Sequence, residues 1–295
     1  MLSYFFFSTT SILCIFQLKN ILEIYNKSFS YLKTLLILIF FIFILINLGL
    51  FKYLYIFKIL IFLSLIWFLY KKQIKLSIVD QVFFLGSFFL IYYNYQTFFS
   101  GTDIFNNFGY FSKYLFYFQN LPSIDSDQKI FDGQYSLPQI IFHNFFLGGK
   151  KIFSEELSNY SNNIFLLINF IIIFEIFKHK KNYFHIFCTF AIFYFLINIF
   201  GAEGLTIRNE EISILLYFSL IVFVINIDKV SYSDCFIIIL SLTMALLNKP
   251  STLFFIFLPF SITFIKFYNE KYSLTKILLS FFIALLLFSH LYKIH

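Results

Sequence analysis

Charged residues are scarce in this chain. They make up 13% of its 295 residues, whereas hydrophobic residues make up 60% and the mean hydropathy is +0.83. A soluble domain carries about 25% charged residues, so this deficit excludes an ordinary soluble fold. In lipid, unpaired backbone groups leave helices and closed barrels as the only spanning structures, and the apolar runs here are continuous rather than alternating. We therefore predict an all-α, polytopic transmembrane helical protein.

Arginine is almost absent, because Arg208 is the only one. The net charge of +7 therefore rests on lysines, which gather at the ends of apolar runs, where the positive-inside rule places them. No basic face stands apart from those runs. We expect membrane lipids as partners and no nucleic acid.

The chain also lacks the patterns of a disulfide framework or a zinc site. Its three cysteines lie in separate apolar runs, without another Cys or His at ligand spacing, and its five histidines form no HExxH array. A metal ion would have to bind to acidic residues. No organic cofactor is predicted, and a divalent metal ion is the one candidate.

Apolar runs of membrane length predict about eight to ten spans, since a span needs roughly 20 residues. Residues 1–16 lack a basic start and a small-residue cleavage site, so we predict a marginal first span rather than a signal peptide, followed by a cytoplasmic connection over 17–33. The confident spans are 34–50, 54–70, 76–98, 162–177, 183–200, 212–227, 235–247, 252–266 and 277–291.

Two lysine clusters assign the sides of the membrane. The clusters at 71–75 and 178–181 both indicate the inside, so the segment of about 99–161 becomes one long extracytoplasmic loop in a single membrane domain, 1–295. Asp80 then lies near the inner interface, or else it is a buried functional acid. We expect the bacterial inner (plasma) membrane as the location.

The long loop begins with a helical pattern. Five apolar residues recur at alternating spacings of four and three, and so share one face of a helix: Ile104, Phe108, Phe111, Leu115 and Phe118. Such a helix would lie on the outer membrane surface with interfacial contacts. Asp103 is placed at its N-terminus, where it either caps free amides or acts as a catalytic carboxylate, and the two roles are compatible. The apolar segment 134–149 is predicted to re-enter the interface and pack beneath this helix.

The same region resembles a known family. The run from Thr102 to Gly109, with Lys113 after it, resembles the Trp-Asp-Glu-Phe-Ser-His-Trp-Gly motif and later lysine in the first outer loop of bacterial GT-C-type membrane glycosyltransferases. Residues 121–122 resemble the Leu-Pro that follows, and 134–138 resemble a Tyr-Pro-Pro segment. The chain departs from the motif at several positions. In particular its Glu, His and second Trp are replaced by Ile104, Asn107 and Phe108, and the Pro-Pro pair is Leu-Pro here.

The resemblance implies a cell-envelope transferase. The donor would be a sugar on a polyprenyl phosphate, the acceptor a lipid or glycan, and Asp103 the base or a ligand of a divalent metal ion. Inverting glycosyl transfer does need a base to take the acceptor proton, and the leaving phosphate needs positive charge nearby.

Further site residues are candidates for binding the substrate. Arg208 is the best phosphate ligand because a guanidinium binds phosphate with two bonds, although a salt bridge to Glu210 or Glu211 is the alternative. Those two glutamates are also candidates for a second acid. Lys249 and Lys113 complete the predicted substrate-binding set, with Lys249 alternatively a lysine that extends to the membrane interface.

Three other functions stay open. A polysaccharide polymerase would also use a large outer loop. A flippase or transporter would place charges near the bilayer midplane and show related halves, whereas the acids here gather in the outer loops. The loss of the motif's Glu and His would suit a non-catalytic GT-C-like membrane protein.

Overall fold

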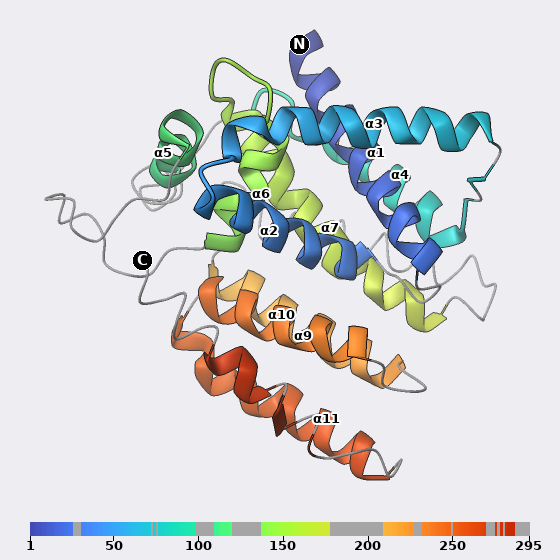
Figure 1. Ribbon diagram of the computed structural model, residues 1–295, viewed down its shortest axis with the longest axis vertical. Helices are drawn as coiled ribbons and strands as arrows, with labels where there is room; N and C mark the ends of the chain where they lie inside the picture. The colour runs from blue at the N-terminus through green and yellow to red at the C-terminus, as the bar shows by residue number, and fades with distance from the viewer. Residues whose placement is uncertain are drawn as a thin grey trace, which may run out of the picture. The chain divides into compact units, whose positions relative to one another are not determined.

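The computed structural model describes residues 1–25, 31–71, 73–74, 76–97, 109–119, 137–177, 209–226, 232–248, 250–269, 275, 278–279 and 281–286. These residues form helices joined by turns, and none of them lies in a strand (Figure 1). The all-α prediction is therefore confirmed for this part of the chain. The chain packs as two units: Met1–Leu121 with Gln139–Ile207, and Pro122–Pro138 with Arg208–His295.

The first unit consists of helices that are mostly apolar along their whole length. In chain order they are α1 (Leu2–Tyr25), α2 (Tyr31–Asn47), the short 3-10 helix η1 (Phe51–Tyr53), α3 (Leu54–Tyr70), α4 (Ile78–Tyr93), α5 (Gly109–Phe118), α6 (Leu137–Leu147) and α7 (Glu155–Phe177). The predicted spans 54–70 and 76–98 coincide closely with α3 and α4. The helix that corresponds to the predicted span 162–177 is longer at its N-terminal end, because α7 begins at Glu155.

The beginning of the chain differs from the prediction. A marginal span over 1–16 and a connection over 17–33 were expected, whereas α1 continues without a break to Tyr25. The reason lies in Lys19, whose Nζ forms ion pairs with Glu23 at 3.0 Å and with Asp80 at 2.9 Å. Because both partners neutralise its charge, this lysine is buried inside the helix packing instead of ending the helix.

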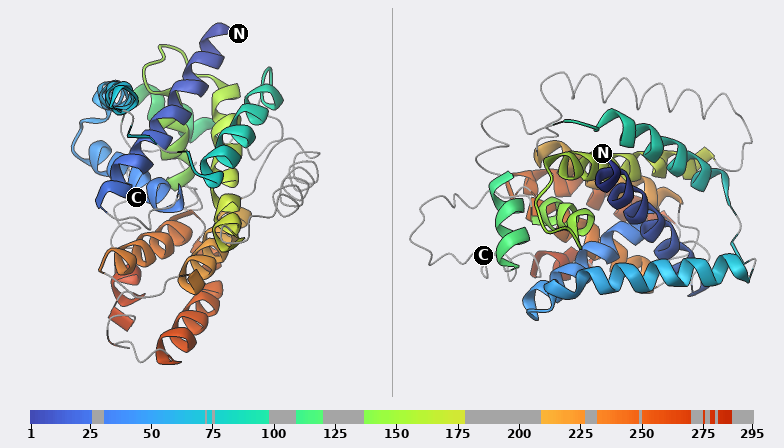
Figure 2. Two further views of the ribbon diagram at one scale, coloured as in Figure 1. Left: turned by 90° about the vertical axis from the view of Figure 1, so that its right-hand side faces the viewer. Right: turned by 90° about the horizontal axis from the view of Figure 1, so that it is seen from above.

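Side-chain contacts establish the directions of the helices. α4 runs antiparallel to α1, since Tyr4 OH donates to Ile91 O near one end and Lys19 pairs with Asp80 near the other. α3 runs in the same direction as α1. Lys58 of α3 bonds to Ser11 of α1, and six residues further along both helices Ser64 bonds to Gln17. Figure 2 shows α1 between α3 and α4.

The helix α7 packs on α4 through polar and small side chains. Asn163 Nδ2 donates to Asn94 Oδ1 at 2.8 Å, and Tyr160 OH donates to the Ser87 carbonyl at 3.2 Å. Gly86 allows the close approach, because a Cβ atom there would lie only 2.8 Å from a methyl carbon of Leu167. These buried polar groups are satisfied by each other, as a low-dielectric interior requires.

Two helical segments among the described residues are long and apolar enough to cross a membrane, Leu2–Ile24 and Phe51–Tyr70. Six shorter apolar helices accompany them. In the second segment, which joins η1 to α3, one face is exposed and carries large apolar side chains: Ile56, Ile59, Leu60, Leu63, Ile66 and Trp67. A contiguous exposed apolar face of this kind marks a surface that meets lipid or another protein.

The second unit is smaller and contains α9 (Asn209–Asn226), α10 (Tyr232–Asn248), the 3-10 helix η3 (Pro250–Ile256) and α11 (Phe257–Asn269). α9 and α10 are antiparallel neighbours, since Ser213 Oγ donates to Ala245 O at 2.9 Å and Ser241 Oγ to Leu216 O at 3.4 Å. The spans predicted at 212–227, 235–247 and 252–266 correspond to these elements. The span predicted at 183–200 lies outside the described residues.

Candidate functional site

The sequence-predicted site residues fall largely outside the described part of the chain. Asp103, Arg208 and Lys249 all lie outside it. Glu210 and Glu211 lie in the first turn of α9, with only their backbone described. The convergence of these residues on one cavity therefore stays a prediction.

Lys113 is the one predicted site residue whose side chain is described. Its Nζ pairs with Glu155 Oε1 at 2.9 Å and lies 5.5 Å from the centre of the Phe153 ring. The ion pair ties α5 to the first turn of α7, where a carboxylate is also favoured by the positive end of the helix dipole. Lys113 thus positions the loop helix against the helices of the first unit.

The loop helix predicted from Asp103 is described from Gly109 onward, as α5. Two residues of its predicted apolar face are buried, Phe111 and Leu115, whereas Phe118 is 64% exposed. The helix ends at Gln119, whose φ of +59° lies in the left-handed region and whose N–H donates to Leu115 O. The predicted apolar face is therefore buried at Phe111 and Leu115 but not at Phe118, and the predicted start at Asp103 lies outside the described residues.

The segment predicted to pack beneath that helix contacts it through Asn144, whereas its predicted re-entry into the membrane interface stays a prediction. It forms α6, whose residues from Pro138 to Leu147 are all buried. Asn144 Nδ2 donates to both the carbonyl and the Oγ of Ser112 in α5, at 3.3 and 3.4 Å. A second polar cluster on α6 holds it against α7, where Gln139 Nε2 donates to Asn162 Oδ1 at 2.6 Å and His143 Nε2 bonds to the same oxygen.

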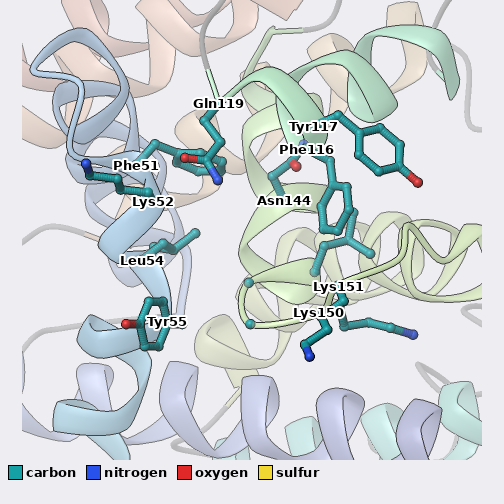
Figure 3. A pocket seen from close by; sticks show the side chains of 13 residues that line it. Phe51, Lys52, Leu54, Tyr55, Phe116, Tyr117, Gln119, Asn144, Lys150 and Lys151 are labelled. Carbon is teal, nitrogen blue, oxygen red and sulfur yellow. The ribbon is translucent and has the colours of Figure 1, made fainter.

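A cavity of about 250 Å³ opens where these elements meet the start of α3 (Figure 3). Its walls come from three places in the first unit: η1 with the first turn of α3, the end of α5, and the end of α6 with the turn after it. Four lining residues are aromatic, and three are lysines: Lys52, Lys150 and Lys151. None of the lining residues in the described part of the chain carries a carboxylate.

The three lysines have no counter-ion within the described residues. Lys52 Nζ lies 5.1 Å from the centre of the Tyr53 ring, and Lys150 Nζ lies 5.7 Å from that of Phe7. Partial burial lowers the pKa of the Lys150 ammonium below its ordinary value, and the charge of Glu156 opposes that shift. Figure 3 shows Lys52 on one wall and Lys150 and Lys151 on the other, with the ends of the three side chains pointing in different directions.

Three helix ends meet at the cavity and contribute partial charges of both signs. The N-terminal end of α3 carries the positive end of a helix dipole, and the C-terminal end of α5 carries a negative one. At the C-terminal end of α6, Lys58 Nζ donates to the Phe145 carbonyl at 3.0 Å, and also to Ser11 Oγ at 2.9 Å. A lysine at a helix C-terminus neutralises the negative end, so α6 adds little negative charge to the cavity.

The turn after α6 sets the direction of the two paired lysines. Gly149 has a φ of +94°, which an L side chain rarely adopts. Lys150 N–H donates to Leu147 O at 2.9 Å and so closes the turn. The chain thereby reverses sharply and brings Lys150 and Lys151 to the cavity mouth.

A second charged cluster lies at the far ends of α1 and α4. Asp80 is fully buried, and its Oδ1 accepts from Lys19 Nζ at 2.9 Å and from Tyr31 OH at 2.7 Å. Its Oδ2 accepts from both the backbone N–H and the Oγ of Ser77, at 2.8 and 2.7 Å, which completes a capping box at the start of α4. Four donors satisfy this carboxylate, which gives it a structural role; its position near the inner interface stays a prediction.

Sequence reasoning missed the cavity lysines. Lys150 and Lys151 lie in the predicted outer loop, and Lys52 lies between the predicted spans 34–50 and 54–70, without a motif that marks them as a site. The sequence does contain one indication of the cavity. The lysine clusters at 71–75 and 178–181 predict that the turn with Lys52 and the loop with Lys150 and Lys151 lie on the same side of the membrane. As for metals, the described residues contain no group of three or more His, Cys, Asp or Glu that could hold an ion.

Comparisons with known proteins leave the family of the chain open. No protein-family model, curated protein or solved structure matches it.

Proposed function

We propose that the chain is an integral membrane protein of the bacterial inner membrane that acts as a GT-C-like glycosyltransferase. It transfers a sugar from a polyprenyl-phosphate donor to a lipid or glycan acceptor on the outer face. Asp103 takes the acceptor proton or holds a divalent metal ion, and Arg208 with Lys249 stabilises the leaving phosphate.

One observation carries the proposal. α5 and α6, which follow the segment that carries the motif, contribute to the walls of a cavity whose described lining residues include three lysines and no carboxylate. A transferase that uses a lipid phosphate requires positive charge close to its base, since the leaving group is an anion. The resemblance around Asp103 and this positive cavity point to the same region of the chain.

The contacts of the first unit agree with the proposed sidedness. The lysine clusters in the sequence place Lys52 and Lys150 outside, and these two residues line one cavity. The same clusters place Lys19 and Asp80 inside, and these two residues form an ion pair. A chain threaded through a bilayer has to bring together residues of the same side, as these pairs do.

The exposed face of α3 supports the membrane setting. Trp67 and Lys71 lie together at its C-terminal end, with Lys71 Nζ 4.9 Å from the centre of the Trp67 ring. Tryptophan and lysine at the end of an apolar helix are typical of the membrane interface.

The experiment replaces Asp103 by asparagine in the full-length protein. Membranes that contain the protein are supplied with polyprenyl phosphates carrying radiolabelled glucose, mannose or arabinose, and label transferred to lipid or glycan is counted. Transfer by the wild type and its loss in D103N support the proposal. The matched control is D125N, in the same outer loop but outside the motif, and it should retain transfer.

Full activity of D103N, at wild-type expression in the membrane fraction, would remove Asp103 from the mechanism. Absence of transfer by the wild type from every donor, with donor phosphates still bound, would favour the non-catalytic alternative.

A further inference from the structure

We propose that the cavity between α3, α5 and α6 is a binding site for the phosphate headgroup of a lipid, held by Lys52, Lys150 and Lys151, with the lipid chain lying along the exposed face of α3. The choice of a lipid phosphate rests on the proposed function. The location and the charge of the site rest on the cavity itself.

Charge is the first argument. Three lysines line one small cavity, none of its described lining residues carries a carboxylate, and none of the three lysines forms an ion pair with a described residue. Their side chains end in different directions from its two walls (Figure 3), and an anion at the cavity mouth would attract all three charges. Glu155 is already paired with Lys113, and the charge of Glu156 acts on Lys150.

Size is the second argument. A volume of about 250 Å³ is below the roughly 300–1,000 Å³ of pockets that enclose a drug-sized ligand. It suits a headgroup whose remaining atoms lie outside the cavity. A phosphate monoester is dianionic at neutral pH, and so matches two or three lysines.

The adjoining surface is the third argument, and it favours a lipid over a free phosphate. Tyr55 lines the cavity and begins the exposed apolar face of α3, which continues through Ile56, Ile59 and Leu60. Phe51, Leu54 and Leu147 supply apolar walls next to the lysines. An amphiphile with a phosphate at one end and a hydrocarbon chain at the other would match both surfaces at once.

The test measures the binding of farnesyl monophosphate to the purified full chain in phosphatidylcholine nanodiscs. Farnesol tests the need for the phosphate, inorganic phosphate tests the need for the lipid chain, and phosphatidylglycerol tests for general attraction to anionic lipid. We expect farnesyl phosphate to bind at least tenfold more tightly than any of these three.

Variants then assign the site. K150Q/K151Q should weaken farnesyl phosphate binding by about tenfold or more, and K52Q on the opposite wall by about fivefold, as expected for the loss of charge-assisted bonds. K150R/K151R keeps the charge and should keep the binding, which separates loss of charge from misfolding. The matched control K71Q removes an exposed lysine at the other end of α3 and should change nothing.

The inference is overturned if K150Q/K151Q binds like the wild type, or if farnesol or phosphatidylglycerol binds as tightly as farnesyl phosphate. Inorganic phosphate binding as tightly as farnesyl phosphate would refute the lipid. Sugar transfer that K150Q/K151Q leaves unchanged would overturn this site alone. Lysine-dependent binding of farnesyl phosphate by a wild-type protein that transfers no sugar would overturn the proposed catalysis alone.

Discussion

Replacing Lys19 of the buried Lys19–Asp80 pair should lower the free energy of unfolding more than replacing Asp80. In Lys19→Met, the Asp80 carboxylate stays buried with only the neutral donors of Tyr31 and Ser77. In Asp80→Asn, by contrast, Lys19 keeps a second carboxylate, Glu23, at 3.0 Å. Leaving a buried charge without its partner lowers the free energy of unfolding by about 3–5 kcal/mol, whereas losing hydrogen bonds of a buried group lowers it by about 1–3 kcal/mol.

We therefore expect Lys19→Met to lower the unfolding free energy by about 3–5 kcal/mol and Asp80→Asn by about 1–3 kcal/mol. The free energy of unfolding of the double variant should be close to that of Asp80→Asn alone, because the Asp80 carboxylate that Lys19→Met leaves uncompensated is then absent. Such strong non-additivity is what a directly contacting pair produces.

The assay is thermal or denaturant unfolding of the full chain in a mild detergent, followed by intrinsic fluorescence. Lys71→Met, at the exposed end of α3, is the control and should stay within about 0.5 kcal/mol of the wild type. Equal losses for the two single variants, or a double variant whose loss equals their sum, would refute the assignment of this pair as one buried, mutually compensated unit.

Three further outcomes follow from packing and charge. Gly86→Leu should destabilise the protein by about 1–3 kcal/mol in unfolding assays, because a Cβ atom at position 86 would lie 2.8 Å from a methyl carbon of Leu167 in α7. Adding Leu167→Ala should recover part of the loss, and no recovery would contradict this close approach. Gly149→Ala should cost about 1–2 kcal/mol through its left-handed backbone, and an unchanged melting temperature would show that the turn adopts another conformation. Farnesyl phosphate binding should weaken as the pH rises above neutrality. The loss should begin below the ordinary pKa of lysine, because burial lowers the pKa of Lys150. K150R should shift the loss to higher pH, since arginine stays protonated, and identical pH profiles of the two proteins would contradict the role of Lys150.

Hydrophobic patterning predicted most helices of the described chain well. Runs such as 54–70 are long, apolar and bounded by lysines, and α3 has those same bounds. The start of the chain was mistaken because a charged residue was taken as the end of a helix. Whether Lys19 lies in solvent or in an ion pair depends on Asp80, which is 61 residues further along the chain.

The candidate site could be predicted only in part for a similar reason. Periodicity located α5 and the buried face of Phe111 and Leu115, since that signal is local. The cavity depends on Lys52 meeting Lys150 and Lys151 from segments that are far apart in the sequence. Motif similarity drew attention to Asp103, and it could not indicate which lysines the fold would bring together.

The most direct test of the account is the sidedness of the cavity. In a variant without its native cysteines, Lys151→Cys and Lys71→Cys are labelled separately with a membrane-impermeant maleimide, in intact cells and in lysed cells. We predict that Cys at position 151 reacts in intact cells and that Cys at position 71 reacts only after lysis. Equal labelling of both in intact cells, the reverse pattern, or recovery of the protein in the soluble fraction would contradict an outward-facing, membrane-embedded site.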